Sequence, residues 1–191
     1  MERRKTGSTK KKPYRPRPYG LTPKQLCGRA VELGATKAAV ISPRKVATAH
    51  WVRAKCQFGC GGYGSSLMCP PHSWPPEETR KLLDAYTTAI LVHCRPRVPA
   101  ERARVKELVV TLEREAFLAN YYKAFSYGSG PCHLCEKCAF EAGCRYPHQA
   151  RPCMEASGVD VYKTARDAGF PIDVVRDRDD EQNYYGLVLL R

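Results

Sequence analysis

The sequence predicts an α/β fold: a single domain with a mixed, mostly parallel sheet, flanked by helices and carrying two cysteine-rich loops. Short apolar runs alternate along the chain with longer segments that show helix caps and helical spacing of apolar residues. Such alternation is typical of strand–helix–strand units with parallel strands. The length of 191 residues is enough to bury one ordinary hydrophobic core. We therefore expect one domain.

The first predicted elements precede the first cysteine group. Thr22, followed by proline, is a hydroxyl N-cap with proline at the first helical position, and Gly34 marks the end of that helix. Residues 38–41 have the composition of a short buried strand. Ser42, again followed by proline, repeats the helix start. The pattern predicts a second helix that runs on to Cys56.

The later elements continue the alternation. Two prolines followed by two glutamates predict a helix that starts at Pro75, since acidic side chains favour the first turn. Residues 88–92 are continuously apolar, as in a central strand. The longest predicted helix runs from Pro99 to about Ala119, where apolar residues recur at helical spacing. The remaining predictions are strands at 122–127, 172–175 and 184–190, and a short helix at 160–168.

The start of the chain differs in composition from the rest. Residues 1–18 hold eight Lys or Arg and one Glu, which is a large part of the formal net charge of +13. Few apolar side chains accompany them, so we expect a disordered basic arm at residues 1–20 and the folded domain at 21–191. The arm is either a solubilising tail or a weak contact for polyanions.

The strongest chemical signal is a run of cysteines within residues 131–153. Cys132, Cys135 and Cys138 are each separated by two residues, and Cys144 follows after five more. Three thiolates at this spacing wrap the corner of an iron–sulfur cubane, as in the ferredoxin run. A structural zinc site usually takes two ligand pairs a dozen or more residues apart. The spacing favours a 4Fe–4S cluster over zinc, with purely structural thiols as the third alternative.

The first cysteine group along the chain lies at residues 56–69, and the run within residues 131–153 is therefore the second motif. Three residues separate Cys56 from Cys60, a Gly-rich turn follows, and Cys69 stands before two prolines. The glycines let the backbone approach a bulky inorganic group closely, although buried thiols in a Gly-rich turn are the alternative. The long gap to Cys69 does not fit a radical-initiating C-x3-C-x2-C motif. Three cysteines are an incomplete set: either Cys153 or Cys94 completes it, or one iron keeps an open position.

Cysteine usage also bears on the compartment. The chain has ten cysteines, which in a short secreted protein would indicate a disulfide scaffold. We identify no apolar signal segment, and the apolar runs are too short to cross a bilayer. Thiols at two- and three-residue spacing then indicate metal ligation in a reducing compartment. We expect a cytoplasmic protein without a membrane partner.

These motifs, with Ala-Arg-Pro at 150–152, resemble those of the bacterial and archaeal family of unknown function described as "predicted metal-binding protein". The resemblance covers roughly residues 22–190. It implies metal binding, with iron–sulfur as the expected kind, and no settled reaction. Cys153 departs from the family, which carries serine there, and is a spare thiol or an additional ligand; the basic arm also looks like an addition. The ligand candidates that the resemblance implies are Cys56, Cys60, Cys69, Cys132, Cys135, Cys138 and Cys144.

Two further pairs of residues carry side chains that can bind a metal. Cys27 and Cys94 are expected to be buried apolar thiols, since free cysteine packs as a small hydrophobe. His133 and His148 flank the second motif, where imidazoles either ligate a metal, move protons or stand solvated in a loop.

Three charged residues also lie close in sequence to the second motif. Arg145 and Arg151 would raise a cluster's reduction potential or hold an anionic substrate, unless they are merely solvated. Glu155 is a candidate partner for one of these two guanidinium groups.

The sequence therefore predicts an iron–sulfur protein with one or two 4Fe–4S clusters. It would serve in electron transfer with a redox partner protein, or as a redox component of a larger system. One alternative is an enzyme in which an open iron binds and activates a small substrate. The other is a zinc-containing nucleic-acid-binding module, although the basic arm has few aromatic residues for stacking. No dinucleotide fingerprint, phosphate loop or Ser/His/Asp order is present, so no catalytic residue is named.

Overall fold

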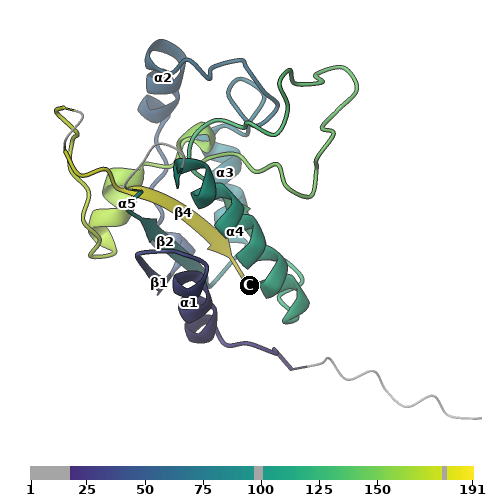
Figure 1. Cartoon of the computed structure of the whole chain (residues 1–191), viewed down its shortest axis with the longest axis vertical. Coiled ribbons are helices and arrows are strands. Elements are labelled where there is room, and N and C mark those ends of the chain that lie inside the picture. Colours follow the sequence, from purple (N-terminus) through teal and green to yellow (C-terminus); the bar gives the residue numbers. More distant parts are fainter. Residues whose placement is uncertain (1–17, 97–100, 178–179) are drawn as a thin grey trace, which may run out of the picture.

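The computed structural model describes residues 18–96, 101–177 and 180–191 (Figure 1). Within them the strands form one four-stranded sheet in the order β1-β2-β4-β3, and each neighbouring pair is antiparallel. The predicted basic arm falls almost entirely outside the described residues. The strands are β1 (Lys37–Ile41), β2 (Ala89–Cys94), β3 (Phe125–Tyr127) and β4 (Tyr184–Leu189).

The expectation of a mostly parallel sheet is wrong. β2 and β3 are both antiparallel to β4, which lies between them, so they run parallel to each other without being neighbours. The helix that joins β2 to β3 makes the crossover that the alternating pattern predicts. However, the last strand of the chain inserts between the two, in the manner of a split strand–helix–strand unit. Alternation of elements along the chain does not say which strands become neighbours.

Five helices in the described residues surround this sheet, and caps explain where several begin. At the start of the first helix, Thr22 and Gln25 form a reciprocal capping box. Asp160 accepts a hydrogen bond from the backbone of Lys163 at the start of the fifth. The helices are α1 (Pro23–Glu32), α2 (His50–Gly59), α3 (Pro76–Asp84), α4 (Glu101–Leu118) and α5 (Val161–Asp167). None of them is long and apolar enough to cross a membrane.

The helix predicted to start at Ser42 begins later than expected. Its prolines give only a short 3-10 turn, η1 (Pro43–Lys45), and α2 starts at His50. The intervening chain is extended, because Thr48 pairs with Val159 in an isolated bridge and the Ala49 amide donates to the Gly158 carbonyl at 2.8 Å. These long-range bonds hold residues 46–49 out of the helical conformation.

Two other predicted elements also differ. Residues 172–175 are not a strand: Ile172 is buried in a core, whereas Val174 is 68% exposed. These residues instead line a cavity that is also lined by Cys56, Cys69 and Cys153. The start predicted at Pro99 for the longest helix lies outside the described residues, and α4 is described from Glu101.

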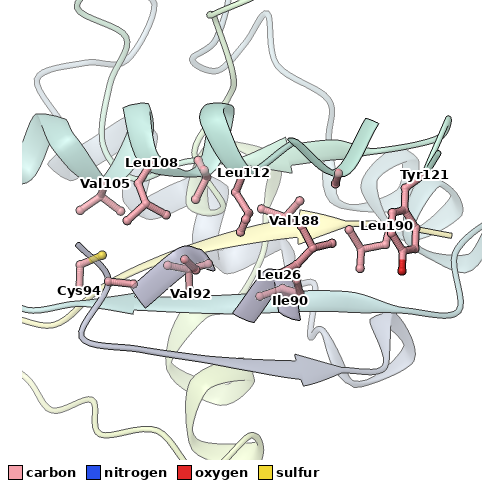
Figure 2. Packing of buried hydrophobic residues seen from close by; sticks show 14 of the residues in the cluster. Leu26, Ile90, Val92, Cys94, Val105, Leu108, Leu112, Tyr121, Val188 and Leu190 are labelled. Carbon is pink, nitrogen blue, oxygen red and sulfur yellow. The ribbon is translucent and has the colours of Figure 1, made fainter. Parts of the chain in front are cut away.

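One hydrophobic core lies between the sheet and the helices α1 and α4. Figure 2 shows Leu26 of α1 close to Ile90 of β2, and Leu108 and Leu112 pointing from α4 into the same core. Every residue of β2 is buried, so its alternate side chains face two different cores. Cys94, the last residue of β2, is part of this first core.

The second core lies on the opposite face of the sheet. Leu91 and Leu187 meet Leu83 of α3 and Ala165 of α5 there, and Met154 is fully buried among them. Met154 directly follows Cys153, so this core fixes the end of the second cysteine motif. The cysteine loops project beyond the end of the sheet from which β3 leads into residues 128–153 (Figure 1).

Candidate metal centre

The first cysteine group is built on the end of α2. Cys56 lies in the last turn of that helix, and Cys60 caps it, with its amide donating to the Cys56 carbonyl at 3.3 Å. The Gly62 amide then donates to the Sγ atom of Cys60 at 3.4 Å. Gly64 has a positive φ of 70°, which suits glycine in this tight turn. The turn brings Cys69 back toward the helix end.

The second group occupies a loop without regular secondary structure. Its four thiols, of Cys132, Cys135, Cys138 and Cys144, line one cavity of about 620 Å³. Cys60 from the first group also lines that cavity. The structure therefore brings together the four thiols that the sequence placed in one motif.

A backbone hydrogen bond ties the two loops together. The Leu67 amide, in the turn between Cys60 and Cys69, donates to the Sγ atom of Cys138 at 3.4 Å. Amide donors to sulfur stabilise a thiolate and tune the potential of a metal bound to it. This donor lies 71 residues from its acceptor in the sequence, so spacing alone did not indicate it.

A second cavity, of about 760 Å³, is lined by Cys56, Cys60 and Cys69 together with Cys153. Cys153 arrives there because Gly128 pairs with it in an isolated parallel bridge after β3. The Ala156 amide donates to the Sγ atom of Cys153 at 3.2 Å. Cys153 thus lines the same cavity as the incomplete cysteine group of Cys56, Cys60 and Cys69.

Arg53 links the three chain segments whose cysteines line this second cavity. Its Nη1 atom donates to the Ser73 hydroxyl at 2.9 Å and to the Ala156 carbonyl at 2.7 Å. The Ser73 hydroxyl also donates to the Ala156 carbonyl at 2.7 Å. One guanidinium group therefore joins α2, the loop after Cys69 and the turn after Cys153. Sequence reasoning missed Arg53, because nothing in the sequence of a helix shows which distant carbonyls it meets.

Burial and neighbouring charges raise the pKa of two thiols at the second cavity, those of Cys56 and Cys153, and so favour their protonated form. Burial raises the pKa of Cys56, and the nearby Cys60 and Glu155 raise it further, against the opposing charge of Arg53. The pKa of Cys153 is raised well above its ordinary value, first by burial and then by Glu155. Burial also raises the pKa of the Glu155 carboxyl. Metal binding at this cavity would therefore release protons.

The two isolated cysteines lie away from both cavities. Cys94 is 6% exposed in the first core, and burial raises its pKa to about 11. Cys27 is half-buried and packs against the same core, with its pKa likewise raised to about 11. The prediction that Cys94 is a buried apolar thiol is confirmed. Neither residue lines a cysteine cavity among the described residues.

The charged candidates near the second motif have mostly structural partners. Arg151 donates to both carboxylate oxygens of Glu113 at 2.5 and 2.7 Å, and Ser126 donates to the same carboxylate at 2.7 Å. This nearly buried ion pair fastens the end of the loop to α4, so Arg151 is committed to Glu113 and not to Glu155 or an anionic substrate. Arg145 lines the first cavity and donates to the Lys137 carbonyl at 2.9 Å.

The histidine candidates are both exposed. His133 lines the first cavity, whereas His148 does not line either cysteine cavity in the described part of the chain. Within the described residues, no three Cys, His, Asp or Glu side chains form a compact group that would hold a single metal ion. The thiols instead surround two larger spaces.

The fold and the site together define an α/β protein in which eight cysteines line two cavities, as expected of a metal-binding protein. The chain belongs to the family described as "Predicted metal-binding protein (DUF2284)", whose model matches residues 39–190. The matched region contains all eight cavity cysteines, and the resemblance seen in the sequence is confirmed. No curated protein and no solved structure matches the chain.

Proposed function

We propose that this metal-binding protein holds two 4Fe–4S clusters and passes electrons between a donor and an acceptor protein. The observation that carries the proposal is the division of eight thiols between two cavities. Cys60 lines both cavities, and assigning it to the second gives four thiols to each. Four thiolates are the usual ligand set of a 4Fe–4S cluster, which supplies reversible one-electron transfer. We number the sets after the cavities that they line. The first set is Cys132, Cys135, Cys138 and Cys144, and the second set is Cys56, Cys60, Cys69 and Cys153.

The donor chemistry supports iron–sulfur over zinc. Both sets consist of thiols, and backbone amides donate to the sulfur atoms of Cys60, Cys138 and Cys153. A zinc ion holds four donor atoms, with sulfur atoms at about 2.3 Å. Among the described residues, not even three Cys, His, Asp or Glu side chains lie close enough together to hold one ion. A cubane presents separate iron corners, so its thiolates stand farther apart.

The arrangement of the two cavities supports electron transfer between them. Gly62 and Pro131 line both cavities. A Cβ atom added to Gly62 would lie 3.0 Å from the Cβ atom of Pro131, so the glycine permits this close approach. Two cluster sites that share one wall place their redox groups near each other. The proposal assigns no substrate to the chain.

An enzyme that binds a substrate beside the second set is the second candidate. The second cavity extends past its thiols to the aromatic side chains of Trp51, Tyr63, Tyr162 and Tyr184. Apolar walls with few polar groups are typical of small-molecule sites. This reading requires an iron with an open position, and therefore that Cys153 is not a ligand.

Metal and sulfide analysis of anaerobically purified protein tests the proposal. We expect a brown protein with about eight irons and about eight acid-labile sulfides per chain, as two cubanes require. About four of each would leave one cluster. Colourless protein with stoichiometric zinc would contradict the proposal and favour the zinc module.

A further inference from the structure

Lys106 of α4 reaches the chain segment between the two cysteine cavities. Its Nζ atom donates to the Pro131 carbonyl at 2.6 Å and to the Gly130 carbonyl at 3.1 Å. Both of these residues line the second cavity, and Pro131 also lines the first. The ammonium group is therefore bonded to the wall that the two cavities share.

The lysine stem packs tightly against the start of this segment. A Cβ atom added to Gly128 would lie 3.1 Å from the Cγ atom and 3.2 Å from the Cε atom of Lys106. Glycine at 128 thus allows the chain leaving β3 to pass directly over the lysine side chain. This contact and the two hydrogen bonds fix residues 128–131 onto α4.

The charge of Lys106 interacts electrostatically with cysteines of both sets. Burial lowers the pKa of Lys106, and the acidic neighbours that oppose this shift are, in order of effect, Cys132, Cys153, Cys69 and Glu155. Cys132 belongs to the first set, whereas Cys69 and Cys153 belong to the second. A partly buried ammonium group without anionic partners would be costly, so thiolates that form at either cavity when a metal group binds would stabilise it.

We propose that Lys106 is a positioning residue shared by both sites: it holds the wall between the cysteine sets, and its positive charge raises the reduction potentials of both clusters. The inference rests on the proposed function, since it assigns a role toward the clusters. A cluster gains negative charge on reduction, and a nearby cation stabilises the reduced form more than the oxidised form. Removing the cation should make both potentials more negative.

Redox titration followed by paramagnetic resonance tests the charge effect. Lys106→Met and Lys106→Gln both remove the positive charge, and the glutamine amide keeps a hydrogen-bond donor. We expect both clusters of each variant to show more negative potentials, with the iron content unchanged in Lys106→Gln. Arg104→Met is the matched control, because it removes one positive charge from an exposed position of the same helix; its potentials should equal those of the wild type.

Hydrogen exchange of the metal-free protein tests the positioning role separately. Amides at residues 128–132 should exchange faster in Lys106→Met than in the wild type or in Arg104→Met. Unchanged potentials in Lys106→Gln, or a shift in one cluster only, would overturn the shared charge role. Unchanged exchange would overturn the positioning role. Wild-type protein without iron would instead refute the proposed function, and the exchange comparison would still decide whether Lys106 holds the wall.

Discussion

At the scale of single residues, the two thiols that could complete the incomplete cysteine group, those of Cys153 and Cys94, have different surroundings. Cys153 lines the second cavity and accepts a hydrogen bond from the Ala156 amide. Cys94 lies in an apolar core with Val105 and Leu108 (Figure 2). Because a ligand's sulfur atom must be able to reach the metal, the thiol that lines the cavity is the better candidate to complete the second set, whereas apolar side chains surround Cys94.

Replacing these two thiols gives the sharpest test of the ligand assignment. Cys153→Ser should lower the iron content by about half or change the resonance spectrum of one cluster, since a hard oxygen ligand suits iron–sulfur chemistry poorly. Cys94→Ala should leave the iron and sulfide counts unchanged. Full iron content and an unaltered spectrum in Cys153→Ser would favour an open iron and the enzyme reading.

At the scale of elements, the cysteine loops and the sheet depend on different interactions. β2 is buried along its whole length and has a partner strand on each side. By contrast, residues 132–144 contain no helix or strand and are mostly exposed or half-buried. Ligation would supply much of the ordering free energy of these loops, whereas apolar burial stabilises the sheet.

Metal removal should therefore affect the two parts unequally. In metal-free protein, amides in residues 56–72 and 131–153 should lose protection from hydrogen exchange, while those of β2 and β4 keep most of theirs. Hydrogen exchange with mass spectrometry, compared before and after chelation under anaerobic conditions, measures this. Equal loss across loops and strands would indicate instead that the metal holds the whole fold.

At the scale of the whole molecule, buried thiols make stability depend on pH. Burial raises the pKa of Cys94 to about 11, above the value of about 8.5 for a thiol in an unfolded chain. The folded protein thus keeps this proton to higher pH than the unfolded chain does. The resulting stability is fully present below the unfolded pKa and is lost as pH rises through the folded pKa.

The metal-free protein should accordingly unfold more easily between about pH 8.5 and 11. For Cys94 the loss is at most about 3 kcal/mol, and other buried thiols change stability in the same direction. Urea unfolding measured across this range gives the free energy of unfolding. Cys94→Val, which keeps the apolar packing and removes the titrating group, should show a shallower fall. An identical fall in both proteins would mean that Cys94 does not contribute.

The sequence was informative about the site because ligand spacing is local. The four cysteines from Cys132 to Cys144 lie within thirteen residues, and the fold places them around one cavity. The position of Cys153 at the second cavity depends on its parallel bridge to Gly128. This bridge joins residues 25 positions apart, so local spacing does not indicate it. Arg53 and Lys106 were missed because most of their hydrogen bonds go to main-chain carbonyls of distant residues, which carry no sequence signal.

The sequence alone determined the local features: the N-cap at Thr22, the positions of most apolar segments and the two cysteine motifs with their family. Each depends on residues a few positions apart, so side-chain chemistry and spacing suffice to predict it. Only the tertiary structure decided that β4 inserts between β2 and β3 and that eight thiols divide between two cavities sharing a wall. These outcomes depend on which distant surfaces bury one another, and the free energy of that burial belongs to the whole core.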